Sequence, residues 1–74
     1  MPARIRPLGP LKKYTGDQRE IAVEPGRTVR EMLSELAIPS EVVAGVVVNG
    51  TMETKDYCIK ENDEIQLYAI MSGG

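Results

Sequence analysis

One short amphipathic helix restricts the fold more than any other stretch of this sequence. Residues 28–31 read Thr-Val-Arg-Glu, the spacing of a capping box in which threonine and glutamate side chains bond each other's backbone amides. Apolar residues then recur at helical spacing, at Val29, Met32, Leu33, Leu36 and Ala37. Pro39 predicts that the helix ends near Ala37. A helix of about ten residues does not persist alone in water, so it must pack against a sheet.

Two short strands are predicted before this helix, because residues 3–8 and 19–24 alternate apolar and polar side chains. The connection between them, residues 9–17, carries turn residues at both ends. We therefore expect a solvated loop for Lys12, Lys13 and Tyr14, and contact with a partner is the alternative.

Further strands are predicted after the helix. The β-branched residues 46–48 indicate an interior strand, and Asn49-Gly50 is a hairpin-turn dipeptide. Residues 51–59 are expected to hold one or two very short strands, anchored by Met52, Tyr57 and Ile59. A polar turn at residues 61–63 then leads into the last strand.

The last strand, residues 64–70, places its side chains on two faces. Ile65, Leu67 and Ala69 point one way, and Gln66, Tyr68 and Ile70 point the other. One helix can cover only one face of a sheet, so the chain is predicted to be an α+β roll whose other face meets solvent or a partner. On that face we expect Tyr68 and Ile70 to form an apolar patch, joined by Met71.

The composition argues against a self-sufficient enzyme. Seventy-four residues leave little room for an enclosed pocket beside a core, and the chain has no His and one Cys, Cys58. The commonest general base and any zinc-type cluster are therefore missing. Cys58 is predicted to be a small buried hydrophobe. The lone cysteine, the lack of a long apolar run and the lack of a signal-peptide core predict a cytoplasmic protein.

Charge is unevenly distributed along the sequence. Residues 1–30 carry seven Lys/Arg against three Asp/Glu, and residues 31–74 carry two against eight. No basic stretch is interleaved with aromatic residues, which argues against nucleic-acid binding. The acidic second half could steer a basic partner toward the end of the chain, and an ordinary solvated surface is the alternative.

The sequence ends in Ser72-Gly73-Gly74, directly after the last predicted strand. Two glycines leave the last backbone atoms without Cβ, so they can enter a slot too narrow for other residues. A free α-carboxylate there is ionised at neutral pH. A frayed end is the alternative interpretation.

The order of these elements, with Val48-Asn49-Gly50, Asn62-Asp63-Glu64-Ile65 and Gly73-Gly74, resembles the MoaD/ThiS sulfur-carrier family over nearly the whole chain. Where that family often has glycine, this chain has Asn62, which tolerates the left-handed conformation. The resemblance implies a ubiquitin-like β-grasp roll, with a mixed sheet of four to five strands packed on one main α-helix. Its first and last strands would be adjacent and parallel. Residues 1–70 would form the domain and residues 71–74 a flexible tail.

The resemblance also implies a function, because a carboxylate must be activated before it can accept sulfur. This chain has no phosphate-binding loop, so it is expected to be a substrate rather than an enzyme, with no bound cofactor. An adenylating enzyme of the MoeB/ThiF type would use ATP to adenylate the Gly74 carboxylate. A persulfide donor would convert it to a thiocarboxylate, and a MoaE-like synthase subunit or a thiazole synthase would accept the sulfur. No nucleic acid or membrane is expected as a partner.

Site residues follow from the same resemblance. Gly73 and Gly74 are expected to thread the active site and to carry the sulfur. Tyr68, Ile70, Met71 and Ser72 are expected to contact the partner, and an extended tail from Met71 would reach about 14 Å.

Several functions stay open from the sequence. The long connection at residues 9–18 resembles the MoaD branch, which favours the small subunit of molybdopterin synthase. A ThiS-like carrier for the thiazole of thiamin is one alternative. A ubiquitin-like modifier joined through Gly74 to lysines is another, and a plain interaction domain is the last.

Overall fold

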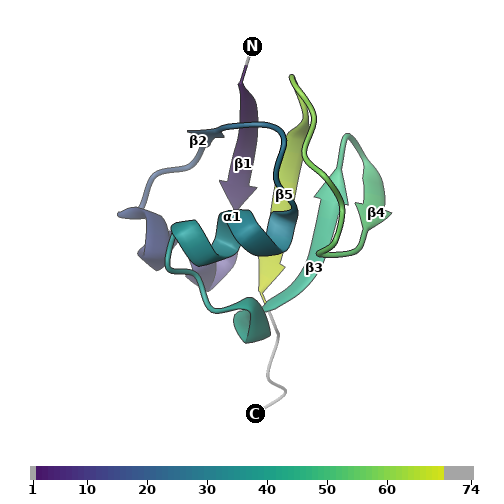
Figure 1. The fold of residues 1–74 in the computed structure, drawn as a ribbon. Coiled ribbons are helices and arrows are strands. Elements are labelled where there is room, and N and C mark those ends of the chain that lie inside the picture. Colours follow the sequence, from purple (N-terminus) through teal and green to yellow (C-terminus); the bar gives the residue numbers. More distant parts are fainter. Residues whose placement is uncertain (1, 70–74) are drawn as a thin grey trace.

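The C-terminal strand lies at the centre of a five-stranded mixed sheet in the computed structural model, which describes residues 2–69. Strand β5 (Glu64–Ala69) pairs in parallel with β1 (Ala3–Pro7), and β1 pairs antiparallel with β2 (Ile21–Val23). On its other side, β5 pairs antiparallel with β3 (Val43–Val48), which continues to β4 (Thr51–Glu53). The strand order is β2-β1-β5-β3-β4 (Figure 1). The predicted β-grasp roll and its parallel pairing of first and last strands are confirmed.

Helix α1 (Val29–Glu35) begins with the predicted capping box. The Thr28 hydroxyl accepts a hydrogen bond from the Glu31 amide at 3.1 Å, and the Glu31 carboxylate accepts one from the Thr28 amide at 2.9 Å. The hydrogen bond from the Thr28 backbone amide, followed by that from its hydroxyl, lowers the pKa of Glu31. The start of the helix is therefore fixed by local chemistry that the sequence displays.

The helix ends at Glu35, close to the predicted end near Ala37. Leu36 caps the helix, and Ala37 adopts a left-handed conformation with φ of 59°. This turn directs Ile38 into the core, where its amide donates to the Leu33 carbonyl at 2.9 Å. The prediction that Ala37 belongs to the buried stripe is wrong, because the left-handed turn leaves Ala37 exposed and buries Ile38 instead.

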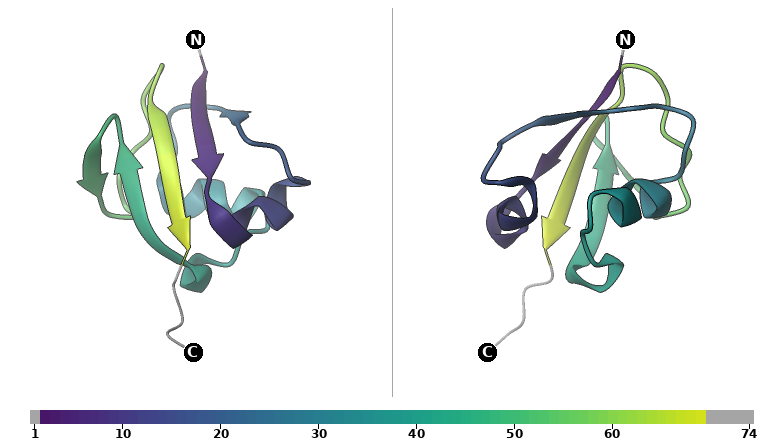
Figure 2. Two further views of the ribbon diagram at one scale, coloured as in Figure 1. Left: turned by 180° about the vertical axis from the view of Figure 1, so that it is seen from behind. Right: turned by 60° about the vertical axis from the view of Figure 1, so that its left-hand side comes forward.

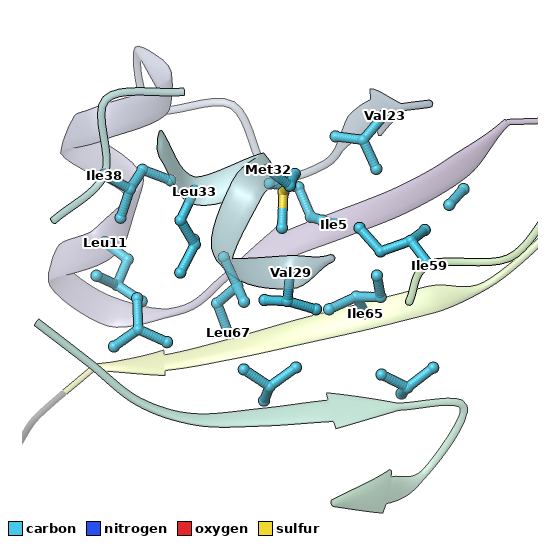
Figure 3. Close-up of a cluster of buried hydrophobic side chains, with 14 residues drawn as sticks. Ile5, Leu11, Val23, Val29, Met32, Leu33, Ile38, Ile59, Ile65 and Leu67 are labelled. Atoms are coloured by element: carbon cyan, nitrogen blue, oxygen red, sulfur yellow. The ribbon is translucent and has the colours of Figure 1, made fainter. Parts of the chain in front are cut away.

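The core is one apolar layer between α1 and a single face of the sheet (Figure 3). Helix residues Val29, Met32 and Leu33 face Ile5, Ile65 and Leu67 from the two central strands. Ala3 also comes from β1, and the remaining members come from the flanking strands and connections: Leu11, Val23, Ile38, Val43, Val46, Val48 and Ile59. The alternation predicted for the last strand is confirmed over residues 64–69, since Ile65 and Leu67 are fully buried and Tyr68 is exposed.

The connection after β1 is a 3-10 helix, η1 (Gly9–Thr15), rather than a loop. Leu11 is fully buried, and the Thr15 hydroxyl donates to the Lys12 carbonyl at 3.0 Å. Tyr14 is half-buried and packs against the core. The expectation of a solvated loop is therefore wrong for Tyr14, because Leu11 and Tyr14 anchor the segment beside the end of β5 (Figure 2).

The chain between β3 and β5 contains two further corrections. Asn49 and Gly50 form the predicted hairpin turn, both with positive φ. Ile59 is buried and Tyr57 packs against the core as expected, but Met52 is 73% exposed and anchors nothing. Cys58 is exposed rather than buried, because it alternates with Tyr57 and Ile59 in an extended segment that bridges to Thr28.

Asp63, in the predicted polar turn, is 5% exposed and organises the start of β5. Its carboxylate accepts hydrogen bonds from the Asn49 amide at 2.9 Å, the Tyr57 hydroxyl at 2.7 Å and the Lys60 backbone amide at 2.8 Å. Burial works to raise the pKa of Asp63, but these three donors together outweigh it and hold that pKa below its usual value. The hydrogen bond to Asp63 in turn raises the pKa of Tyr57 to about 12.

Replacing Asp63 with Asn tests this network. Asn cannot accept all three hydrogen bonds as a carboxylate does, so we expect Asp63→Asn to lower the free energy of unfolding at pH 7 by about 2–4 kcal/mol. Because the pKa of Asp63 is lower folded than unfolded, its stabilisation is present above about pH 4 and is lost as pH falls through the folded pKa. Urea unfolding at neutral and acidic pH measures both effects.

The control is Asp56→Asn, which removes a carboxylate paired on the surface with Arg30 at 3.3 Å. That variant should lose less than about 1 kcal/mol. An Asp63→Asn protein that keeps the full stability and acid sensitivity of the wild type would contradict the role given to Asp63.

Removing the helix cap gives a second test. Thr28→Ala leaves the Glu31 amide without its acceptor, so we expect the free energy of unfolding to fall by about 1 kcal/mol. Ser34→Ala, at an exposed position of the same helix, should be neutral or slightly stabilising. Equal destabilisation by the two substitutions would show that the cap has no special role.

Candidate functional site

The structure describes the base of the predicted site. Ile70, Met71, Ser72, Gly73 and Gly74 lie outside the described residues, so the expectations for them stay predictions. Ala69 ends β5, and the C-terminal ends of the parallel strands β1 and β5 lie at one end of the sheet (Figures 1 and 2). A partner that acts on the residues after Ala69 must therefore approach this end of the domain.

Tyr68 lies on the sheet face that α1 does not cover, as its alternation predicts, and is 42% exposed. Its hydroxyl donates to the Gln66 side chain at 3.2 Å. The residue opposite on β3 is Gly45, and a Cβ added to this glycine would lie 3.8 Å from the Tyr68 Cβ. Because Gly45 has no side chain, it leaves one side of Tyr68 uncovered. The position suits an aromatic contact with a partner, and that role stays a prediction.

The rest of the open face divides into a polar half and an apolar half. On the β1 side, Arg4 and Arg6 both pair with Glu20, at 3.6 and 3.3 Å. On the β4 side, Val47 is half-buried beside Met52, the second large exposed apolar residue. Met52 was expected to anchor the core and not to be part of this surface. The strand register that places Met52 opposite Val47 follows from the Asn49-Gly50 turn and could have indicated it.

Basic side chains lie near the end of β5. Lys13 lines one groove with Ala69, and Lys12 lines a neighbouring hollow with Arg6, Arg19 and Glu20. The parallel pairing of β1 with β5 carries the basic first part of the chain to this end. Lys13 is the charged residue that lines the groove with Ala69, and Glu41 directly precedes Val42 in the same groove, so steering of a basic partner by the acidic second half stays a prediction.

Within residues 2–69, no three His, Cys, Asp or Glu side chains are grouped so that they could hold a metal ion. The same part of the chain contains no helix with the length and apolarity needed to cross a membrane. The one buried carboxylate in this range, that of Asp63, is fully engaged by hydrogen bonds that support β5.

Comparison with known proteins identifies the family. The family model of the ThiS family matches residues 5–74, which is nearly the whole chain and includes both terminal glycines. Comparison with curated proteins gave no match.

Solved structures support the same fold. SAMP1 from Haloferax volcanii is similar with a TM-score of 0.71 and 22% identity, and each chain is covered completely. The HVO 2177 protein of the same organism has a TM-score of 0.73 at 17% identity, over 100% of this chain and 87% of that one. A Pyrococcus furiosus protein, provisionally assigned as molybdopterin converting factor subunit 1, gives 0.63 at 17% identity, over 93% and 97%. At these identities the likeness concerns the fold.

The family match indicates a carrier protein and not an enzyme. Members of the ThiS family are carriers rather than catalysts, hold sulfur as a covalent thiocarboxylate and bind no cofactor, and the family implies an adenylating partner. The expected β-grasp fold and the absence of an enzymatic role of its own agree with this match. The chain therefore belongs to the ThiS family.

Proposed function

We propose that this chain carries sulfur on the Gly74 carboxylate for the synthesis of a cofactor. The observation that carries the proposal is the family match, which runs from the first strand through Gly73 and Gly74. The exposed Tyr68 and the open sheet face provide a surface next to that end.

The chemistry needs a partner at each step. An adenylating enzyme of the MoeB/ThiF type joins the Gly74 carboxylate to AMP and releases pyrophosphate from ATP. The terminal sulfur of a persulfide then attacks the acyl carbon, and AMP leaves. A thiol cleaves the S–S bond of the resulting acyl disulfide, which releases the thiocarboxylate and a new disulfide. The carrier contributes the carboxylate and its presentation, and the enzymes contribute the reactive groups.

In this scheme the residues at the end of the chain have different roles. Gly73 and Gly74, without Cβ atoms, fit a narrow channel to the ATP site. Ile70, Met71 and Ser72 contact the walls of that channel, and Tyr68 docks the partner from the open face. An aromatic side chain with an uncovered side is a common anchor of protein interfaces.

We propose molybdopterin synthesis as the destination of the sulfur, with this chain as the small subunit beside a MoaE-like subunit in the cytoplasm. The seven-residue helix η1 occupies the long connection that resembles the MoaD branch. Transfer to a thiazole synthase is the second candidate, and the ThiS description of the matching family model favours it.

Mass spectrometry of the intact protein tests the carrier function. Incubation with ATP, a persulfide donor, a thiol and the MoeB/ThiF-type enzyme of the same organism should replace one oxygen of Gly74 by sulfur. A variant that lacks Gly74 should gain no sulfur. Its terminal carboxylate belongs to Gly73 and lies one residue short of the position that the enzyme adenylates.

The control is Cys58→Ser, because the exposed thiol of Cys58 could add sulfur as a persulfide. This variant should form the thiocarboxylate as the wild type does. Sulfur uptake that is lost with Cys58, or kept without Gly74, would refute the carrier function. ATP-dependent conjugates of higher mass on a denaturing gel would instead indicate a protein modifier.

The docking role of Tyr68 gives a separate prediction. Tyr68→Ala should raise the KM of the carrier in the adenylation reaction about thirtyfold, equivalent to about 2 kcal/mol of lost anchoring. Met52→Ala, which removes the large exposed apolar side chain on the same face at the outer strand β4, should leave KM nearly unchanged. Similar KM values for the two variants would exclude Tyr68 as the anchor.

A further inference from the structure

An apolar groove of about 300 Å³ lies at the base of the tail, on the helix-covered side of β5. Helix η1 forms one wall with Pro10, Leu11 and Tyr14, Val42 at the end of η2 (Ser40–Val42) forms another, and Ala69 lies between them. The groove is therefore built from three elements that meet where β5 ends. It lies opposite Tyr68, whose side chain points to the other face of the same strand.

Lys13 stands at the rim of this groove, and Lys12 lies beside it. The Lys13 ammonium group lies 5.2 Å from the centre of the Tyr14 ring, a cation–π contact that keeps the charge beside the groove. Lys12, on the same helix, lines the neighbouring hollow with Arg6, Arg19 and Glu20, and Glu20 is already paired with Arg6 at 3.3 Å. No acidic residue among those the structure describes lines the groove itself, and Glu41 on η2 is the nearest carboxylate along the chain to Val42.

The length of chain after Ala69 limits what can cover the groove. Five extended residues span about 17 Å, so an enzyme that reacts with Gly74 must bring its surface within that distance of Ala69. Ala69 is itself a wall of the groove. An enzyme engaged with the tail therefore has its surface next to η1 as well as next to Tyr68.

We propose that an acidic segment of the adenylating enzyme docks on η1, with an apolar side chain in the groove and carboxylates facing Lys12 and Lys13. This inference rests on the proposed carrier function and extends it. The enzyme then holds the end of β5 from both faces, at Tyr68 and at the η1 groove. The lysines contribute mainly to the rate of encounter, and the groove contributes to the register of docking.

Steady-state adenylation with the purified MoeB/ThiF-type enzyme of the same organism tests the inference. Lys12→Gln/Lys13→Gln should raise the KM of the carrier about fivefold at low salt with kcat unchanged, and should weaken the dependence of kcat/KM on ionic strength. Val42→Thr, which keeps the shape of the side chain but adds a hydroxyl to the groove, should raise KM about threefold.

The matched control is Lys60→Gln, which removes a lysine beside Asp63 at the opposite end of β5. This variant should keep the wild-type KM and salt dependence, and thermal unfolding should show that all variants are folded. Wild-type protein that is not adenylated would refute the carrier function. Adenylation of the wild type with the same KM and salt dependence for the η1 variants would refute only docking on η1.

Discussion

Fourteen apolar side chains lie in one layer between helix α1 and a single face of the sheet. With one α-helix among residues 2–69, this layer covers one face and leaves the other open. A small domain of this size has little other burial available, so the central strands and the helix depend on the same contacts. The division into a covered and an open face is thus a consequence of the core, and it decides which side of β5 presents Tyr68.

The two ends of β5 are stabilised by different kinds of interaction. At its start, the buried Asp63 carboxylate joins the β3–β4 turn, Tyr57 and the Lys60 backbone through hydrogen bonds. At its end, apolar contacts from η1 and η2 surround Ala69. A polar network is directional and fixes the register of the strand, whereas the apolar end offers surface that a partner can share.

The sequence was sufficient for features that depend on local chemistry. Residues 28–31 identified the helix start, Asn49-Gly50 the hairpin, and the alternation in residues 64–69 the buried and open faces. It was insufficient where tertiary packing decides. The burial of Ile38 depends on the left-handed Ala37, and the exposure of Met52 depends on its position at the sheet edge. The place of Lys13 beside Ala69 depends on how η1 packs against the end of a strand more than fifty positions later, which no local pattern records.

The central place of β5 also affects the order in which the domain can form. Its pairing with β1 joins the two ends of the described chain, which gives the fold a high contact order and makes the closing step slow. During synthesis, β1, α1 and β3 are complete before the strand that must lie between β1 and β3 exists. A nascent chain therefore cannot complete its sheet until Ala69 has emerged, so a complete sheet is evidence that translation has passed Ala69.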